Sequence, residues 1–214
     1  PVFYPESGTY AASEPETKAL MDLVYNNPQI GAVFQFGLAN NLSTPEVFNS
    51  AKANERITSS WSANDVEVSK YVSSLYKEST KSLGEPTKLA HERGNFANTA
   101  YYHLGKFSFV SPGWWPAVSD SSKVTKPAVA EDVFYKWVDQ NAVQGAILPW
   151  TSVVHPSFPN QEVEVGGVVD IYRNNPPIAF LHESSNAHTD FVQRLIQAMP
   201  ELVFQQPVVT ALGG

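Results

Sequence analysis

Histidine and carboxylate side chains are the first candidates for metal binding or acid–base chemistry in this sequence. His182, followed directly by Glu183, stands six residues before His188 on a predicted helix. Two metal ligands on one helix face need a spacing of about four residues, so these two histidines point to different sides. We interpret them as polar positions of an amphipathic helix. The spacing of the remaining histidines is not that of metal ligands either: His91, His103 and His155. We therefore predict no metal ligands within this chain.

A dense polar cluster, His91-Glu92-Arg93-Gly94-Asn95, lies between two predicted helices. Polar loops on a rigid scaffold often bind ligands, so Arg93 and Asn95 are candidate substrate-binding residues. The alternative interpretation is a solvated loop that binds nothing.

Two amides, Asn40 and Asn41, follow a short apolar segment that is typical of a buried strand. Ligands of open α/β sheets bind beyond the carboxyl ends of the strands, so both side chains could orient a substrate. Asparagine equally favours side-chain-to-backbone hydrogen bonds in turns, and the sequence leaves both roles open.

Two carboxylates, Glu162 and Glu164, share one face of a predicted strand before Gly166-Gly167. A carboxylate whose pKa is raised by burial can act as a general base, which makes Glu164 a candidate catalytic residue. The alternative is a half-exposed strand without a catalytic role.

Composition and missing motifs exclude several classes of protein. The chain has 214 residues, 14 basic and 21 acidic side chains, a net charge of −7 and no cysteine. Disulfides, thiolate zinc sites and cysteine nucleophiles are therefore absent. The acidic balance argues against nucleic acid as a partner, and no apolar run approaches the roughly 20 residues of a membrane span. We find no Gly-x-Ser-x-Gly elbow, phosphate-cradling loop or dinucleotide fingerprint.

The elements that must position these residues alternate between helix and strand. The segment Ser13-Glu14-Pro15-Glu16 predicts a helix start with a capping box, followed by an apolar face of Ala19, Leu20, Leu23 and Val24. Further helices are expected at residues 64–83, 96–104, 129–143 and 178–199. Strands are expected at 30–36, which should be buried on both faces, at 106–111, at 161–165 and at 202–204. This alternation predicts an α/β sandwich.

Several of these segments together resemble the C-terminal part of a bacterial zinc carboxypeptidase, a family of metallopeptidases. Residues 10–20 resemble the family's Ser-Glu-x-Glu-Thr helix, and residues 28–36 resemble the central strand that follows it. Gly94-Asn95-Phe96 and Phe107-Ser108-Phe109 resemble the substrate loop and the strand that leads to the catalytic glutamate. Residues 163–167, 174–177 and 188–191 resemble the tail of bacterial members. The resemblance implies a mixed, mostly parallel sheet sandwiched between helices.

The resemblance also implies peptide hydrolysis with zinc as cofactor, in a periplasmic or secreted protein. In the family, a His-x-x-Glu pair and a later histidine hold the metal, a glutamate acts as base, and an arginine clamps the terminal carboxylate of the peptide. The His-x-x-Glu pair and the clamp lie upstream of the matching helix. We therefore expect residues 1–214 to be the C-terminal part of one such domain, with the upstream part of the same protein as a partner.

The chain departs from the family at two matching positions. Gly37 stands where the third zinc ligand is expected, and Pro112 stands where the catalytic glutamate is expected. Asn40 or Asn41 would be a weak zinc ligand, and Glu164 would be the carboxylate left to act as base. Two functions follow: an incomplete hydrolase domain, or a degenerate member that binds peptide or cell-wall ligands without cleaving them. An unrelated α/β binding or structural domain is the third possibility.

An aromatic pair, Trp114-Trp115, follows the predicted strand that ends near Pro112. Beside a substrate cleft, these rings could stack on a ligand or cover a pocket. The alternative is packing in the hydrophobic core.

Overall fold

The computed structural model describes residues 8–10, 12–37, 39–84, 86, 95–117 and 127–201. Helices and strands alternate along these residues, as the sequence predicts for an α/β protein. The elements, in chain order, are α1 (Pro15–Asn26), β1 (Ala32–Phe36), α2 (Ser50–Ala53), α3 (Ala63–Ser79), a 3₁₀ turn (Lys81–Leu83), α4 (Phe96–Tyr102), β2 (Phe107–Ser111), α5 (Pro127–Gln140), β3 (Ile147–Val153), β4 (Val163–Val168), α6 (Ile171–Asn174) and α7 (Ile178–Ala198). None of the described helices is long and apolar enough to cross a membrane. The strand expected at 202–204 lies outside the described residues.

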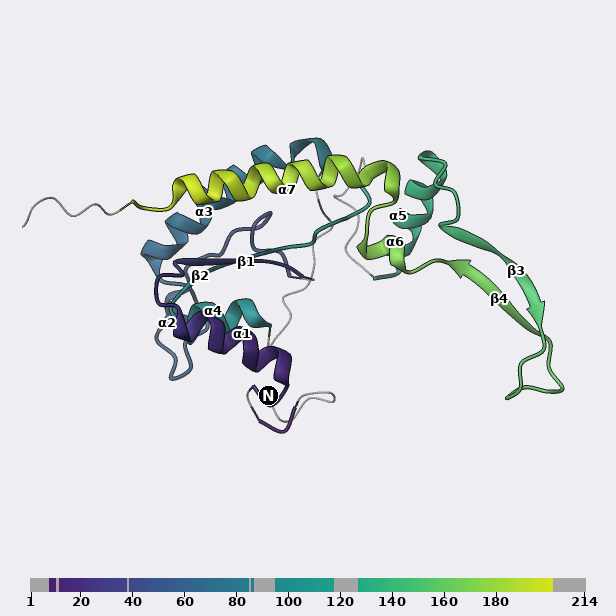
Figure 1. Cartoon of the computed structure of the whole chain (residues 1–214), viewed down its shortest axis with the longest axis horizontal. Helices are drawn as coiled ribbons and strands as arrows, with labels where there is room; N and C mark the ends of the chain where they lie inside the picture. The colour runs from purple at the N-terminus through teal and green to yellow at the C-terminus, as the bar shows by residue number, and fades with distance from the viewer. Residues whose placement is uncertain are drawn as a thin grey trace, which may run out of the picture.

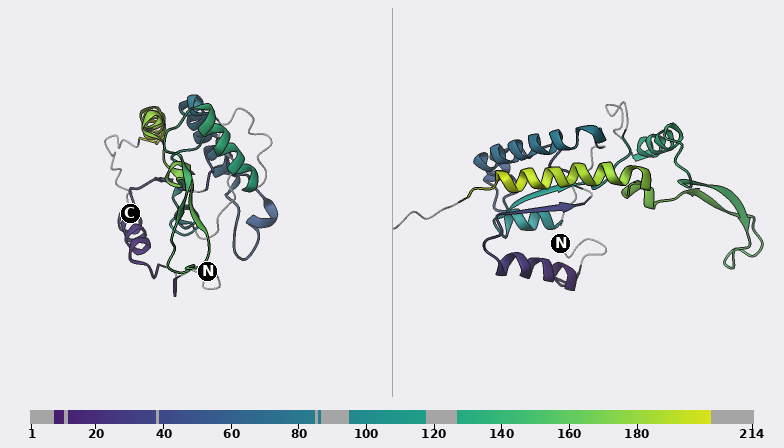
Figure 2. Two further views of the ribbon diagram at one scale, coloured as in Figure 1. Left: turned by 90° about the vertical axis from the view of Figure 1, so that its right-hand side faces the viewer. Right: turned by 45° about the horizontal axis from the view of Figure 1, so that its top comes forward.

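The body of the molecule has three layers (Figure 1). Strands β1 and β2 pair in parallel, in a register that runs from Ala32 opposite Phe107 to Phe36 opposite Ser111. Helices α3 and α7 lie side by side over one face of the strands (Figure 2), and α1 and α4 lie on the other. Because the strands are parallel, both carboxyl ends meet at one edge of the sheet, beside the N-terminal half of α7.

The described strands do not form the single mixed sheet that was expected. Strands β3 and β4 make a separate antiparallel hairpin, which projects from the body (Figure 1). Gly166 and Gly167, predicted to end a strand, instead lie inside β4. The register breaks between Leu148 and Thr151, and there a Cβ at Gly166 would lie 2.7 Å from Cα of Trp150. Glycine is thus what lets the bulged strand approach its partner.

The main core lies between α3, α7 and the strands. From α3 it takes Val66, Val72 and Tyr76, whereas Val68 and Tyr71 of the same helix are exposed. Ser69 and Ser73 complete the buried stripe because each bonds the backbone of the loop after β1. The remaining members of this core come from α7, β2 and the connecting loops: Leu42, Trp61, Leu83, Phe109, Trp115, Ala187, Phe191 and Leu195.

Helix α1 and strand β1 are less buried than the sequence predicts. In α1 only Val24 is buried, while Leu20 and Leu23 are 47% and 55% exposed. The expected capping box is absent, because Ser13 Oγ donates to the neighbouring Glu14 carboxylate and α1 has no side-chain cap. The residues of β1 are half-buried or exposed, whereas β2 is buried on both faces from Ser108 onward. The difference arises because β2 lies between β1 and the loop that carries Asn41.

Candidate functional site

A cavity of about 660 Å³ opens at the carboxyl ends of β1 and β2. Phe36 pairs with Ser111, so Gly37 and Pro112 continue the two strands beside each other at the edge of the cavity. The amide of Gly37 donates to the carbonyl of Ser111 at 3.0 Å. The wall is completed by residues of β1, of the segment after β2, around α6 and along α7: Phe34, Gly113, Trp114, Asn174, Asn175, Pro176, Leu181, Ser184, Ser185, His188, Thr189 and Val192.

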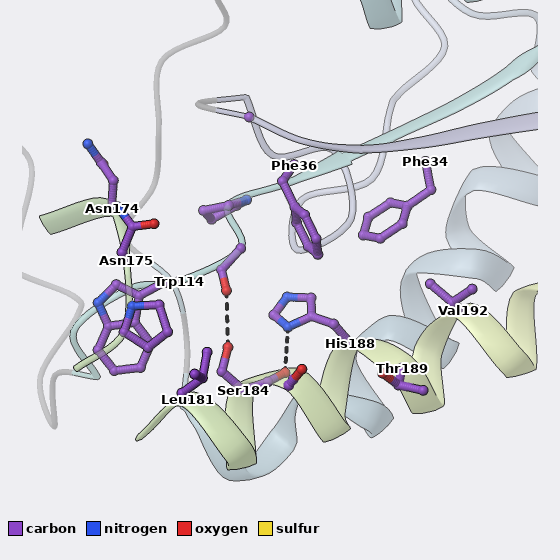
Figure 3. Close-up of a pocket in the computed structure, with 15 residues that line it drawn as sticks. Phe34, Phe36, Trp114, Asn174, Asn175, Leu181, Ser184, His188, Thr189 and Val192 are labelled. Atoms are coloured by element: carbon purple, nitrogen blue, oxygen red, sulfur yellow. Dashed lines mark hydrogen bonds between the residues drawn. The ribbon is translucent and has the colours of Figure 1, made fainter. Parts of the chain in front are cut away.

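Aromatic rings line this cavity at two places: Phe34 and Phe36 lie near His188, and Trp114 lies at the other end, beside Asn175 and Leu181 (Figure 3). Phe34 and Phe36 meet edge to face with ring centroids 5.2 Å apart. Trp114 lines the cavity and donates its indole N–H to the Tyr172 carbonyl. Trp115, by contrast, is buried in the core and donates to the Leu83 carbonyl. The two tryptophans of the predicted pair therefore have different places, and Trp114 is the one at the cavity.

The opposite side is polar and comes from α7. Ser184 and His188 are one turn apart, and both are buried. Ser184 Oγ donates to the Gly113 carbonyl at 3.1 Å, which ties the helix to the segment after β2. His188 Nδ1 lies 2.8 Å from the Ser184 carbonyl. Burial lowers the pKa of the His188 imidazole, and the Ser184 and Pro112 carbonyls oppose that shift.

A buried hydroxyl network supports the strand end beneath the cavity. Ser111 Oγ donates to the Pro112 carbonyl at 2.8 Å, so the phenol of Tyr76 donates to Ser111 Oγ. Desolvation raises the pKa of Tyr76 to about 12, although the hydrogen bond with Ser111 works against the shift. Because Tyr76 and Ser111 are both fully buried, this network fixes the point at which the chain leaves β2.

The two asparagines after β1 use their side chains on the protein backbone. Asn41 Nδ2 donates to the Ser108 carbonyl, and Asn41 Oδ1 accepts from the Val110 amide, both at 2.8 Å. Asn40 Oδ1 accepts from the Ser43 amide in a turn. Neither side chain lines the cavity. These bonds are the alternative that the sequence left open, and the substrate-binding role of both residues stays a prediction.

Of the other predicted site residues, the described ones, Asn95 and Glu164, do not line the cavity. Asn95 caps α4 by accepting from the Asn98 amide at 2.8 Å. Arg93 lies outside the described residues. Glu164 is exposed on β4 in the projecting hairpin and does not line the cavity, so the structure does not bring it to Gly37 or Pro112.

Sequence reasoning missed the roles of His188, Ser184 and Phe36. The spacing of His188 and His182 carries no information on burial, and in the structure His182 is exposed while His188 is buried. The available signal was the spacing of Ser184 and His188, which puts both on one face of a helix together with Phe191. That face proves to be the buried one.

The side chains at the cavity do not fit the zinc ion that the family resemblance implies. A catalytic zinc site uses three protein ligands drawn from histidine, aspartate, glutamate and cysteine. As far as the chain is described, the cavity wall offers a single imidazole and no carboxylate, and Gly37 and Pro112 supply no donor side chain. Across the described part of the chain, no three potential ligands of these types come together.

Comparison of the chain with protein-family models, with curated proteins and with solved structures found no match in any of the three.

Proposed function

We propose that this chain is a ligand-binding α/β domain with a carboxypeptidase-like fold. It binds an uncharged, mainly apolar group of a peptide in the cavity at the strand ends and does not hydrolyse the peptide. The observation that carries the proposal is the wall of the cavity: aromatic and neutral polar side chains surround Gly37 and Pro112.

The size and lining of the cavity suit a neutral group. A volume of about 660 Å³ falls within the range of about 300–1,000 Å³ that is common for small-molecule sites. Phe34, Phe36 and Trp114 offer ring faces and edges, while Asn174 and Asn175 offer amides (Figure 3). Among the residues that the structure describes, none of those lining the cavity is a lysine, arginine, aspartate or glutamate. A charged ligand group would lose its hydration here without gaining an ionic partner, and that loss is costly.

The same wall argues against peptide hydrolysis by these residues. Hydrolysis needs a group that activates water and a group that stabilises the developing negative charge. His188 is the one titratable side chain among the described residues of the wall, and its Nδ1 is already engaged with Ser184. The zinc carboxypeptidase activity remains the second candidate, favoured by the register that sets Gly37 beside Pro112, the two positions matched to the family's metal ligand and base.

Calorimetric titration of the protein with N-acetyl-tryptophan amide, which carries no charge, tests the binding proposal. Two matched variants locate the site: Ser185→Trp fills the mouth of the cavity, and Asn186→Trp places the same ring on the next residue, outside the cavity. Both side chains are exposed, so neither change disturbs the core. We expect Ser185→Trp to abolish binding and Asn186→Trp to preserve it. Equal behaviour of the two variants, or no binding to the unmodified protein, would contradict the proposal.

A second assay separates binding from hydrolysis. The protein is analysed for zinc by elemental analysis and incubated with a blocked peptide that ends in a free tryptophan. We expect no stoichiometric zinc and no release of the terminal residue. Zinc at one equivalent together with release of tryptophan would overturn the proposal in favour of the hydrolase.

A further inference from the structure

Strand β1 has one edge that pairs with β2 and a second edge that pairs with no described strand. The amide of Gly37 donates to the Ser111 carbonyl, so the backbone groups of Gly37 point toward β2. Successive residues of a strand turn their backbone groups to opposite edges. Those of Gln35 therefore point toward β2 as well, whereas those of Phe34 and Phe36 point to the second edge, which we call the open edge of β1.

Strand β2 follows the same alternation, and its second edge is paired. Ser111 faces β1, while the Ser108 carbonyl and the Val110 amide face the other way, where the side chain of Asn41 binds both. The open edge of β1 has no such substitute. Within the described part of the chain, no hydrogen bond uses the outward backbone groups of Phe34 or Phe36.

The open edge also lacks the features that usually protect an exposed strand. Proteins block such edges with lysine, proline or a bulge, because a row of unpaired amides and carbonyls invites another strand. The residues of β1 are Ala-Val-Phe-Gln-Phe, none of them charged and none of them proline, and the register with β2 has no break. A further strand can therefore pair with this edge.

The open edge leads into the cavity described above. Figure 3 shows the side chains of Phe34 and Phe36 on the same side of β1, toward α7, and both line the cavity. In an antiparallel pair, two residues directly opposite each other turn their side chains to the same face, with Cβ atoms about 4.5–5.5 Å apart. A residue paired with Phe36 thus directs its side chain toward α7, at the carboxyl end of β1 where the cavity opens.

We propose that an extended peptide pairs with the open edge of β1 as an antiparallel strand. Its backbone exchanges hydrogen bonds with Phe34 and Phe36, and the residue opposite Phe36 places an uncharged, apolar side chain in the cavity. In strand addition of this kind, the main chain supplies affinity and the pockets for alternate side chains supply specificity. The inference rests on the proposed function, because it states how the peptide that fills the cavity is held.

The size of the edge favours a peptide over a second copy of this chain. Five residues of strand extend over about 17 Å, whereas a stable interface between proteins buries about 800 Å² on each partner. One short edge falls well below that area, but it matches the length of a peptide of four or five residues. Antiparallel pairing is preferred because it is slightly more stable per residue than parallel pairing.

Amide hydrogen exchange, measured by NMR with and without a peptide, tests the inference. The probe is the N-acetylated tetrapeptide amide alanine-tryptophan-alanine-alanine. The amides of Phe34 and Phe36 should exchange rapidly in the free protein. When nine in ten molecules hold the peptide, their exchange should slow about tenfold, because only the free tenth exchanges. The amides of Val33 and Gln35, which face β2, should exchange slowly in both samples.

Two N-methylated forms of the same peptide provide the matched comparison. In the proposed register, the tryptophan amide points to the carbonyl of Phe36 and the next amide points to solvent. A methyl group on the tryptophan nitrogen should weaken binding by about tenfold, because it removes a hydrogen bond and obstructs the edge. A methyl group on the following alanine nitrogen should leave the affinity unchanged.

Three results would contradict the inference. The first is rapid exchange of the Phe34 and Phe36 amides with the peptide bound, and the second is equal binding of the two N-methylated peptides. The third is slow exchange of both amides without peptide, which would mean that the edge is already covered; sedimentation would then show whether a second copy covers it. In each case, binding of N-acetyl-tryptophan amide that Ser185→Trp abolishes would leave the proposed function standing. Failure of every probe to bind would overturn both.

Discussion

Replacement of Asn41 by leucine tests whether this amide acts as a structural substitute for a neighbouring strand. Asn41 is 7% exposed, and its side chain pairs the Ser108 carbonyl and the Val110 amide on the edge of β2 that β1 does not use. Leucine has a similar size but can make neither bond. The change therefore leaves the Ser108 carbonyl and the Val110 amide buried without their side-chain hydrogen-bond partner.

The magnitude follows from these two groups. Each buried polar group left unpaired costs about 1–3 kcal/mol, so Asn41→Leu should lower the free energy of unfolding by about 2–6 kcal/mol. Domains of this size are stable by only about 5–15 kcal/mol, so the loss would be plain in a urea titration. The matched control is Asn40→Ala, which removes a single bond to the Ser43 amide in a partly buried turn and should cost about 1 kcal/mol.

The alternative role predicts a different pattern. If Asn41 served mainly to bind substrate, Asn41→Leu would leave the free energy of unfolding almost unchanged and weaken ligand binding instead. A loss no larger than that of Asn40→Ala would refute the structural argument. A large loss of stability in Asn41→Leu, with unchanged binding of N-acetyl-tryptophan amide in the folded fraction, would support it.

Three further changes give sharp expectations. Burial raises the pKa of Tyr76 to about 12 in the folded protein, so the unfolded chain ionises first above pH 10 and the free energy of unfolding should fall between pH 10 and pH 12. Tyr76→Phe should reduce that fall in urea titrations. An identical fall in the variant would count against this role of Tyr76. The pKa of His188 is lowered, so the unfolded chain takes up its proton first and stability should drop as pH falls below about 6.5; a pKa of His188 at or above 6.5 by NMR would be the opposite result. Gly166→Ala should speed amide hydrogen exchange throughout β3 and β4, because its Cβ would meet backbone atoms of Trp150, whereas Gly105→Ala, with no atom within 4 Å, should leave the hairpin protected.

The sequence predicts most helices of this protein and both parallel strands. Helices α3, α4, α5 and α7 all begin and end within a few residues of the expected bounds, because hydrophobic periodicity is a local property. Of the hairpin, the sequence predicts β4 but not β3, because Pro149 interrupts the strand pattern of β3. It also places the end of β4 too early, because Gly166-Gly167 has the composition of a strand end. Only the pairing of the two segments shows that these glycines accommodate a bulge.

The candidate site was harder to predict because its features depend on contacts between distant residues. The amide of Asn41 reaches a strand 67 positions further along the chain, which no local pattern indicates. His188 is equivalent to His182 by composition and differs only because α7 packs one of its faces against the strand ends. The register of β1 and β2 brings Gly37 and Pro112 side by side. That these two positions match the metal ligand and the base of the zinc carboxypeptidases stays a prediction from the sequence.

The most direct test of the account is a crystal structure of the protein with N-acetyl-tryptophan amide, with diffraction data recorded at the zinc absorption edge. The account predicts the indole inside the cavity, in contact with the rings that line it. It also predicts no anomalous zinc peak beside Gly37 and Pro112. A zinc peak at that place, or a ligand bound outside the cavity, would contradict it.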